Sequence, residues 1–347
     1  MDKTLAWLWL ADAVGSACQY ARELLDQWPD PEELYESLRA GQVAPPFCLS
    51  DGAAARLLDT TPFDYEERLD HCLLTGVDIL TPDDPAYPAR LRDLPDLPLV
   101  LYVTGDKSCL NDRRYVGMIG TRRPSAYGRQ AAYDLSLAAA RQDVVIVSGL
   151  ADGLDSEGHR AAVAAGVPTI AFLGTAIDVT YPAANGPLRR QIEALGGAVC
   201  SEYPPQYQGK TKGTFLARNR LIAAQAEVLC VAEARLRSGT LNTVSHAEDY
   251  GRPVLAVPGS IYSTQSHGTN ELLRTHRAEP LCEAADIFRH LALDAPSEED
   301  TTTEFSPASV SADARAVYAR LGPTAQGIGA LCAATGLPAG RVLAAWT

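Results

Sequence analysis

Five short segments of this chain combine glycine, hydroxyl or cationic residues in patterns that suit phosphate binding, and four of them follow an apolar run. The first segment, Gly120–Arg123, follows the apolar run Val116–Ile119 and precedes a predicted helix. Backbone N–H groups and the positive end of the helix dipole attract an anion there, and arginines bind phosphate oxygens. The segment lacks both G-x-G-x-x-G and G-x-x-x-x-G-K-[ST], so it does not predict a nucleotide cofactor. An ordinary strand-to-helix turn remains the alternative.

The second segment, Ser148–His159, also follows an apolar run and opens a predicted helix. Its serine lacks the G-x-S-x-G pattern of a nucleophile elbow, so the segment does not predict covalent catalysis. Asp155 and His159 stand four residues apart, a spacing that could suit a metal ion. We favour the more frequent arrangement, in which the carboxylate caps backbone N–H groups and the histidine is buried and hydrogen-bonded.

The third segment concentrates positive charge, with four cations and one aromatic ring within eleven residues. Cations along a groove, together with an aromatic face on which a base stacks, are what single-stranded nucleic acid requires. On a helix, Phe215 and Asn219 would share one face and Arg218 would point elsewhere, so not every cation can reach one ligand. A core position for Phe215 is equally compatible with the pattern. In chain order the segment contains Lys210, Lys212, Phe215, Arg218, Asn219 and Arg220.

The last two segments offer further donors for phosphate groups. The triplet Ser238-Gly239-Thr240 stands between the apolar run Val228–Ala232 and a predicted helix, which makes backbone and hydroxyl donors available together. The fifth segment, Pro258–Ser260 with residues 266–270, follows the run Val254–Val257 and has a similar composition. One such turn carries little information. Several that converge on one sheet edge predict an anion-binding trough, which suits a polynucleotide better than a single nucleotide.

The elements that must position these segments alternate between strand and helix. Apolar runs that alternate with helices predict a doubly wound parallel sheet in an α/β domain. Ligands of such folds bind at the carboxyl ends of the strands, where the five segments lie. The predicted strands are 116–119, 144–147, 167–173, 198–200, 228–232 and 254–257, and the predicted helices are 127–141, 155–165, 185–195, 216–226 and 239–250.

Four parts follow from the pattern along the chain. Residues 1–76 predict a small helical domain of the SAM or helix-hairpin kind, with an amphipathic first helix and with Asp30 as the N-cap of a later one. Residues 77–292 contain the predicted sheet, and residues 293–312 form an acidic, proline-interrupted linker. Residues 313–347 predict three short helices of a helix-turn-helix or truncated winged-helix type, because the chain stops where a wing would follow.

The chain has 347 residues, of which 46% are hydrophobic and 21% are charged, a composition typical of a globular protein. The net charge of −13 argues against a simple basic nucleic-acid binder, but the charge is unevenly spread. Residues 1–104 carry 7 Lys and Arg against 19 Asp and Glu, whereas residues 105–292 carry 20 against 18. The eight cysteines include no C-x-x-C pair, so neither disulfides nor zinc are predicted. Because no apolar run is long enough to span a bilayer, we expect a cytoplasmic protein without a membrane partner.

The segments resemble the DNA processing protein A family (DprA, also called Smf), bacterial mediators of natural transformation. The resemblance covers about residues 77–290, and its motifs stand in the order IGTRRPSAYG, VSGLADGLDSEGH, LGTAIDVTYPAAN, SEYPP, FLARNRLIAA, SGTLNTVSHAEDYGRPVLAVPGS and GTNELL. It implies an extended Rossmann-like domain that binds single-stranded DNA without a cofactor. It also implies a homodimer formed through that domain, and the loading of RecA recombinase onto incoming DNA. No catalytic residue and no metal site are expected.

By matching motif, the resemblance implies that Arg122, Lys212, Phe215 and Arg218 contact DNA. It implies that glycine and hydroxyl residues of the turns build phosphate pockets around them. Asp152 stands where the family usually has a basic or neutral residue, which predicts a weaker phosphate contact at that point. The full set of residues expected to bind DNA is Gly120, Thr121, Arg122, Arg123, Ser148, Gly149, Lys210, Lys212, Phe215, Arg218, Asn219, Arg220, Ser238, Gly239 and Thr240.

Two other classes of function are compatible with parts of the pattern. A Rossmann-type nucleotide phosphoribohydrolase of the lysine-decarboxylase-like group would share the strand-turn-helix phosphate pockets. Its signature P-G-G-x-G-T-x-x-E is absent, and the triplets at 258–260 and 238–240 are only fragments of it. A scaffold that binds protein partners and no nucleic acid is the third class. The resemblance favours a non-enzymatic DNA-binding protein over both.

Overall fold

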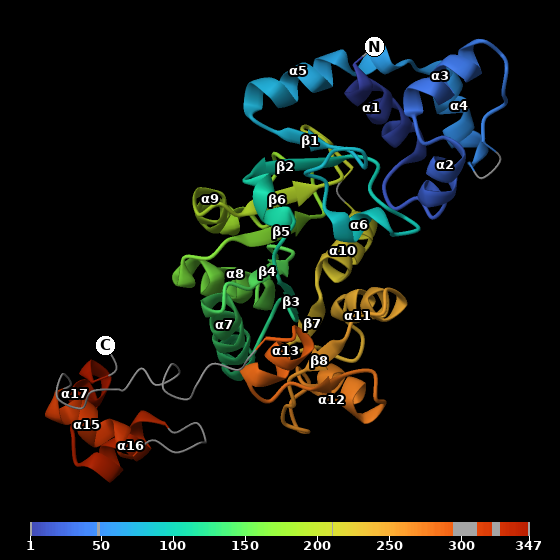
Figure 1. Cartoon of the computed structure of the whole chain (residues 1–347). Helices are drawn as coiled ribbons and strands as arrows, with labels where there is room; N and C mark the ends of the chain where they lie inside the picture. Colours follow the sequence, from blue (N-terminus) through green and yellow to red (C-terminus); the bar gives the residue numbers. More distant parts are fainter. Residues whose placement is uncertain (1, 47–48, 210, 294–310, 321–326, 346–347) are drawn as a thin grey trace. The chain divides into compact units, whose positions relative to one another are not determined.

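The computed structural model describes residues 2–46, 49–209, 211–293, 311–320 and 327–345 (Figure 1). The chain forms two compact units, Met1–Ala295 and Pro296–Thr347, which are treated separately here. Residues 294–310, most of the predicted linker, lie outside the described residues. The sequence-based boundary at residue 76 falls inside the first unit, so it stays a prediction.

One nine-stranded sheet organises the first unit, in the order β1-β2-β6-β5-β4-β3-β7-β8-β9. The parallel part of the sheet consists of β6, β5, β4, β3, β7, β8 and β9. Strand β2 pairs antiparallel with both β6 and β1. The strands are β1 (Asp78–Leu80), β2 (Leu101–Gly105), β3 (Tyr115–Ile119), β4 (Val145–Ser148), β5 (Thr169–Leu173), β6 (Ala198–Ser201), β7 (Val228–Val231), β8 (Val254–Ala256) and β9 (Glu279–Pro280).

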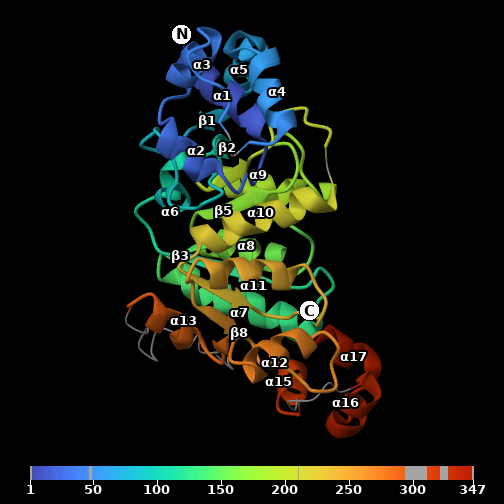
Figure 2. The same ribbon diagram turned by 90° about the vertical axis from the view of Figure 1, so that its right-hand side faces the viewer.

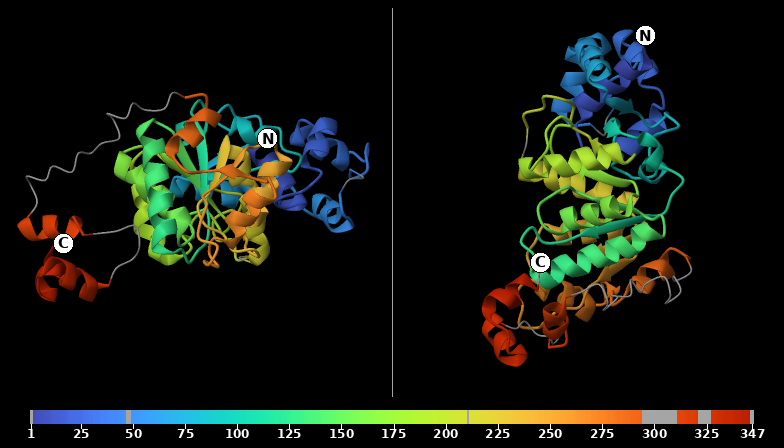
Figure 3. Two further views of the ribbon diagram at one scale, coloured as in Figure 1. Left: turned by 90° about the horizontal axis from the view of Figure 1, so that it is seen from below. Right: turned by 90° about the vertical axis from the view of Figure 1, so that its left-hand side faces the viewer.

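Helices cover both faces of this sheet, as the prediction of a doubly wound α/β fold requires (Figures 1 and 2). One face carries α7 (Ala126–Arg141), α8 (Leu154–Ala165) and α9 (Gly186–Ala194), and α13 (Ala284–His290) packs on α7. The other carries α10 (Lys212–Gln225) and α11 (Thr240–Asp249), which lie side by side, and α12 (His267–Arg274) packs near β8. The left view of Figure 3 shows the sheet between the two helical layers.

The order of the parallel strands reverses between β3 and β7. Strands β4, β5 and β6 follow β3 outward in one direction, and β7, β8 and β9 continue in the other. At such a reversal the crossover helices leave on opposite faces, so the carboxyl ends of the two central strands border a crevice. The turns that follow β3 and β7 contain the first and fourth of the predicted phosphate-binding segments.

The N-terminal helices pack around α1 (Lys3–Val14), next to the β1 edge of the sheet (Figure 1). All six side chains from Leu5 to Leu10 are buried, so α1 is enclosed by its neighbours and the predicted amphipathic helix is wrong here. Asp30 caps the helix after it through the N–H of Glu32, as predicted. The surrounding helices are α2 (Ala21–Gln27), α3 (Pro31–Arg39), α4 (Asp51–Asp59) and α5 (Glu66–Thr75).

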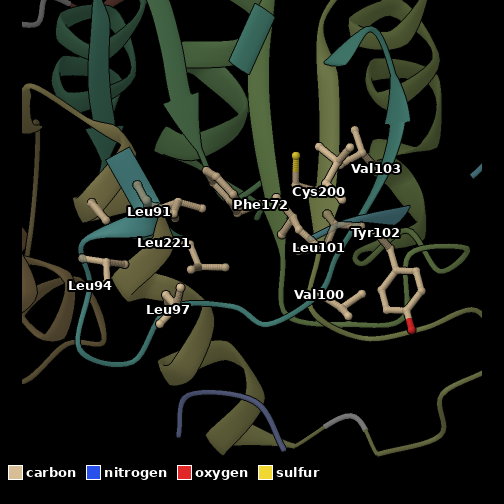
Figure 4. Packing of buried hydrophobic residues seen from close by; sticks show 14 of the residues in the cluster. Leu91, Leu94, Leu97, Val100, Leu101, Tyr102, Val103, Phe172, Cys200 and Leu221 are labelled. Carbon is tan, nitrogen blue, oxygen red and sulfur yellow. The ribbon is translucent and has the colours of Figure 1, made fainter. Parts of the chain in front are cut away.

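The core of the first unit is continuous from the short helix α6 (Ala89–Arg92) to α10. Figure 4 shows leucines 91, 94 and 97 on one side and Leu221 of α10 beside them. Phe172 of β5 and Cys200 of β6 extend the same cluster towards Val103 of β2. Buried hydrophobic area of this kind holds the antiparallel edge strands and α10 in one body.

Three helices make up the described part of the second unit: α15 (Ala312–Tyr318), α16 (Ile328–Thr335) and α17 (Ala339–Ala344). They pack on one another through Val317, Leu331 and Val342. The sequence predicts three helices in these places, and Gly336 ends α16 in the left-handed conformation expected of a glycine after a helix.

The six predicted strands and the five predicted helices of the sheet domain agree with the structure to within about two residues, with one exception, while β9, α6, α12 and α13 were not predicted. Helix α10 begins at Lys212, four residues before the predicted start. Thr211 and Thr214 form a reciprocal capping box, each hydroxyl accepting the backbone N–H of the other at 3.3 Å. This earlier start places Lys212 and Phe215 in the first turn of the helix, which determines where their side chains lie.

His159 of α8 makes folding stability depend on pH. Its Nδ1 lies 2.8 Å from the Thr169 hydroxyl oxygen, and that hydroxyl donates to the Ile146 carbonyl, so Nδ1 carries the hydrogen that it donates. Burial lowers the pKa of His159 to about 3, with Arg218 acting in the same direction. The unfolded chain therefore binds a proton that the folded chain excludes, and stability falls as the pH drops below about 6.5.

We expect the His159→Asn variant, which keeps an N–H donor without a titrating ring, to lose this dependence. Between pH 6.5 and pH 5 the parent protein should lose about 2 kcal/mol more unfolding free energy than the variant. Urea denaturation at a series of pH values measures the difference, with the exposed His276→Asn as control. Equal slopes for the parent and His159→Asn would contradict the expectation.

Candidate nucleic-acid interface

A cavity of about 590 Å³ opens at the carboxyl edge of the sheet, at the reversal between β3 and β7. Four of the five predicted segments contribute to its lining, which comes from the β3–α7, β4–α8 and β7–α11 turns and from α10. The polar and aromatic lining residues are Thr121, Arg122, Asp155, Tyr181, Thr211, Lys212, Phe215, Arg218, Asn219, Ser238, Thr240 and Thr243.

The β3–α7 turn is held at both ends by Glu233, the residue at the end of the β7 segment. The carbonyl of Glu233 accepts the N–H of Thr121 at 2.9 Å, and its carboxylate accepts the N–H of Ser125 at 2.9 Å and the Ser125 hydroxyl. Glu233 is buried, whereas Arg122 and Arg123 between these anchors are exposed. The turn therefore presents its two cations to solvent from a fixed backbone.

Arg122 and the aromatic side chains form the wall opposite α11. The guanidinium carbon of Arg122 lies 5.5 Å from the centroid of the Phe215 ring, a cation–π distance. The Tyr181 ring, from the turn after β5, also lies close to the Phe215 ring, at 5.6 Å between centroids. Phe215 is half-buried rather than enclosed in the core, and it lines the cavity. A flat ring beside an exposed cation suits a ligand with both a base and a phosphate.

The amino ends of α10 and α11 supply the remaining donors. Lys212 is exposed in the first turn of α10, while Lys210 lies outside the described residues. Asn219 links the two helices by donating to the Gly239 carbonyl and to the Asn242 amide oxygen, at 3.4 and 3.3 Å. Ser238 precedes α11, and its buried hydroxyl has no hydrogen-bond partner within the described part of the chain. Such a hydroxyl beside a helix amino end is available to a phosphate oxygen.

The β4–α8 turn differs from the prediction, because its donors are used inside the protein. The Ser148 hydroxyl donates to the Met118 carbonyl at 2.6 Å and is fully buried. The Asp155 carboxylate accepts the backbone N–H groups of Gly149 and Ala151. Gly149 leaves no room for a side chain, since a Cβ would lie 2.2 Å from the Arg218 guanidinium. Ser148 and Gly149 thus support the cavity from beneath, and a direct contact with DNA is not proposed for them.

Arg218 lies at the base of the cavity and is 4% exposed. Its guanidinium donates to the carbonyls of Gly149 and Phe172, which ties the ends of β4 and β5 to α10. Burial lowers the pKa of Arg218 to about 10, although the Asp155 carboxylate opposes the shift. Burial also raises the pKa of Asp155, and Arg218 and Arg122 oppose that change. The opposite charges of Arg218 and Asp155 therefore stabilise each other in a poorly solvated environment.

Arg220 faces away from the cavity, so its predicted DNA contact is not retained. It is 1% exposed, with Nε 3.0 Å from an Asp96 oxygen and a terminal nitrogen 2.6 Å from a Glu202 oxygen. Burial lowers the pKa of Arg220, but the two carboxylates outweigh that effect and raise it overall. Residues 218 and 220 are separated by about 200° around a helix, which is why only one of them reaches the cavity.

The fifth predicted segment lies at a different place. Pro258, Gly259 and Ser260 line a separate cavity of about 600 Å³, beside Tyr127 and Glu233. The Tyr127 hydroxyl donates to the Pro258 carbonyl at 2.8 Å, which connects α7 to the turn after β8. The single trough predicted from all five segments is thus a cavity built from four, with a second cavity on the far side of the β3–α7 turn.

Two residues of the site, Tyr181 and Glu233, were not assigned a role from the sequence, and a third, Asp155, has a different role from the predicted one. Tyr181 was visible only as part of a motif, although an aromatic residue shortly after an apolar run was a usable signal. Glu233 directly follows the Val228–Ala232 run, and a carboxylate at a strand end could have been expected to bind turn N–H groups. For Asp155 the predicted capping role is wrong, because α8 begins after Gly153 without a side-chain cap and the carboxylate lies in the cavity lining instead.

A doubly wound sheet with a cationic, aromatic cavity at its strand-order reversal defines a Rossmann-like α/β protein. Residues 78–292 match the family model described as DNA recombination-mediator protein A, and residues 301–346 match the DprA winged helix domain. The chain belongs to the DNA recombination-mediator protein A (DprA) family, as its motifs predict.

Curated relatives and solved structures agree with this assignment. A DprA protein from Mycobacterium tuberculosis is 37% identical over 295 residues, which cover 81% of this chain and 73% of the relative. The DNA processing protein DprA of Bacillus subtilis is 35% identical over 216 residues, or 62% and 72% of the two chains. The crystal structure of DprA from Streptococcus pneumoniae matches with a TM-score of 0.67 and 29% identity, covering 81% of this chain and 95% of that one.

A second solved structure concerns the single-stranded DNA binding mode of DNA processing protein A from Helicobacter pylori. It matches with a TM-score of 0.56 and 32% identity, and it covers 62% of this chain and 95% of that one. Within the residues that the structure describes, no helix combines the length and the apolar character needed to cross a membrane.

The structural role of Arg220 leads to a stability prediction. Arg220→Met should lower the free energy of unfolding by about 3 kcal/mol or more, because it leaves the Glu202 carboxylate buried without its cation. Adding Glu202→Gln should recover part of the loss. Chemical denaturation of both variants, with the exposed Arg237→Met as the matched control, measures these differences. A cost for Arg220→Met no larger than that of the control would show that the ion pair contributes little.

Proposed function

We propose that the cavity at the reversal between β3 and β7 binds single-stranded DNA without sequence preference. One observation carries the proposal: Arg122, Lys212 and Phe215, from the β3–α7 turn and from α10, line the same cavity. Cations for phosphates and an aromatic face for a base are the combination that binds unpaired strands. The Helicobacter pylori relative, whose structure concerns single-stranded DNA binding, supports the proposal.

The shape of the site favours an unpaired strand over a duplex. Phe215 lies within a cavity of about 590 Å³, where only a base that has left its stack can reach the ring. The Arg122 guanidinium lies 5.5 Å from the ring centroid, so a base at the ring would bring its phosphate close to this cation. Stacking and phosphate contacts do not involve the hydrogen-bonding edges of the bases, so the binding is expected to be independent of sequence.

The local charge supports binding of a polyanion in spite of the acidic chain. The cavity lining contains the cations Arg122, Lys212 and Arg218 and one carboxylate, Asp155. Most of the net charge of −13 belongs to residues 1–104, outside the cavity lining. Phosphate contacts release counterions, so the affinity should fall steeply as the salt concentration rises.

The names of the relatives extend the proposal to a process. DNA processing protein is the name that they carry, and the matched family is one of recombination mediators. We infer that this chain processes DNA in the cytoplasm during natural transformation, without catalysing a reaction itself. Homodimer formation through the sheet domain and loading of RecA onto the bound strand complete the proposed role. The family assignment leaves the phosphoribohydrolase alternative without support.

Substitution of the two exposed cations tests the DNA-binding proposal. We expect Arg122→Ala and Lys212→Ala each to weaken binding of oligo-dT and of mixed-sequence oligonucleotides alike. Each should also reduce the slope of log affinity against log salt by about one unit, because one phosphate contact is lost. Fluorescence anisotropy over a range of salt concentrations measures both quantities.

Arg113→Ala is the matched control, since this exposed arginine precedes β3 at the opposite edge of the sheet. It should leave affinity and salt slope close to those of the parent protein. If Arg122→Ala and Lys212→Ala bind as tightly as the control, the cavity is not the DNA site and the proposal fails.

Loading of RecA is tested separately, by adding purified RecA to oligonucleotides coated with single-strand-binding protein. The parent chain should speed RecA filament formation, and the Arg122→Ala variant should do so less, because loading needs the bound strand. Light scattering of the free protein reports whether it is a dimer. If the parent and the variant accelerate RecA filament formation equally, RecA loading does not depend on this cavity.

A further inference from the structure

The floor of the cavity contains a carboxylate where the sequence predicts a phosphate pocket. Asp155 stands in the first turn of α8, is 7% exposed and lines the cavity. Its carboxylate accepts the N–H groups of Gly149 and Ala151, which are the backbone donors of the β4–α8 turn. An anion of the protein itself thus occupies the place at which a helix amino end would otherwise bind a phosphate.

The surroundings of Asp155 fit an anion held in place. Arg218 lies beneath it, fixed by its bonds to the Gly149 and Phe172 carbonyls, and Arg122 acts on it from the rim. The turn itself has little freedom, because Gly153 has a φ of +83° and a Cβ there would lie 2.4 Å from the Thr121 carbonyl oxygen. A carboxylate on a fixed turn cannot move aside cheaply for a competing anion.

The rim of the cavity differs from its floor in this respect. Arg122 and Lys212 are exposed and line the cavity. Phosphates therefore find donors at the rim, while a phosphate at the floor would meet the Asp155 charge. A polynucleotide gains affinity from several rim contacts at once, whereas a free nucleotide depends on one deep phosphate site.

We propose that Asp155 is a specificity-determining residue that closes the cavity floor to phosphate groups. The cavity then takes the phosphodiester chain of a polynucleotide along its rim and excludes inorganic phosphate and mononucleotides. This inference rests on the proposed function, because it explains how the same site distinguishes a DNA strand from the abundant free nucleotides of a cell.

Removing the carboxylate should open the floor to a small anion. In Asp155→Ala the N–H groups of Gly149 and Ala151 and the Arg218 guanidinium lose their anion, so inorganic phosphate should replace it. We expect 10 mM phosphate, compared with chloride at equal ionic strength, to raise the melting temperature of this variant by about 3 °C or more. The parent protein and the control Asp134→Ala, an exposed carboxylate of α7 outside the cavity lining, should show no such difference.

A second variant keeps the size of the side chain and removes only its charge. Asp155→Asn should bind oligo-dT about fivefold more tightly than the parent, because a negative charge that repels the bound phosphates is removed. If Asp155→Ala does not fold, this measurement decides the question.

The outcomes separate this inference from the proposed function. A folded Asp155→Ala that gains no phosphate-specific stability overturns the role of Asp155, even where the parent binds oligo-dT. If the parent does not bind oligo-dT, the proposed function fails, while phosphate-specific stabilisation of Asp155→Ala would still show that Asp155 excludes phosphate from the floor.

Discussion

The parallel pairing of β3 with β7 is the constraint on which the site depends. It joins two halves of the chain that are far apart in sequence, with Val116 opposite Val228 and Ile119 opposite Val231. Because the strands run in the same direction, the turns that leave them meet at one edge, and Glu233 after β7 can bind both ends of the turn after β3. The exposed position of Arg122, and hence the cationic wall of the cavity, follows from this bond pattern.

The cations of the third segment divide into two roles according to burial. Arg218 and Arg220 are enclosed and bind carbonyl or carboxylate oxygens of the protein, so they hold strands and loops to α10. Lys212 is exposed at the cavity rim, as Arg122 is on the facing turn. The buried guanidinium groups donate their hydrogen bonds to other parts of the protein, whereas the exposed cations remain available to a ligand. The number of cations in a segment therefore overstates the number that can meet a phosphate.

Prediction from the sequence succeeded where one local pattern decides the result. Strands β3 to β8 and their crossover helices were predicted because apolar runs alternate with helical spacing and with glycine turns. Prediction failed where residues distant in the sequence determine the surroundings of a side chain. Helix α1 is buried on nearly all sides because other helices surround it, and Ser148 and Gly149 are used internally because Met118 and Asp155 lie within reach. The fifth segment has the right composition, yet its residues line a different cavity from the other four segments.

The sequence by itself determined the α/β class, the positions of the turns and the family, because these depend on residue type and spacing along the chain. Only the tertiary structure decided which donors remain available. Asp155 and Glu233 are ordinary carboxylates in the sequence, but one lies in the cavity floor and the other anchors its wall. A donor that is already bound cannot serve a ligand, and whether it is bound depends on groups brought close by the fold rather than by the order of residues.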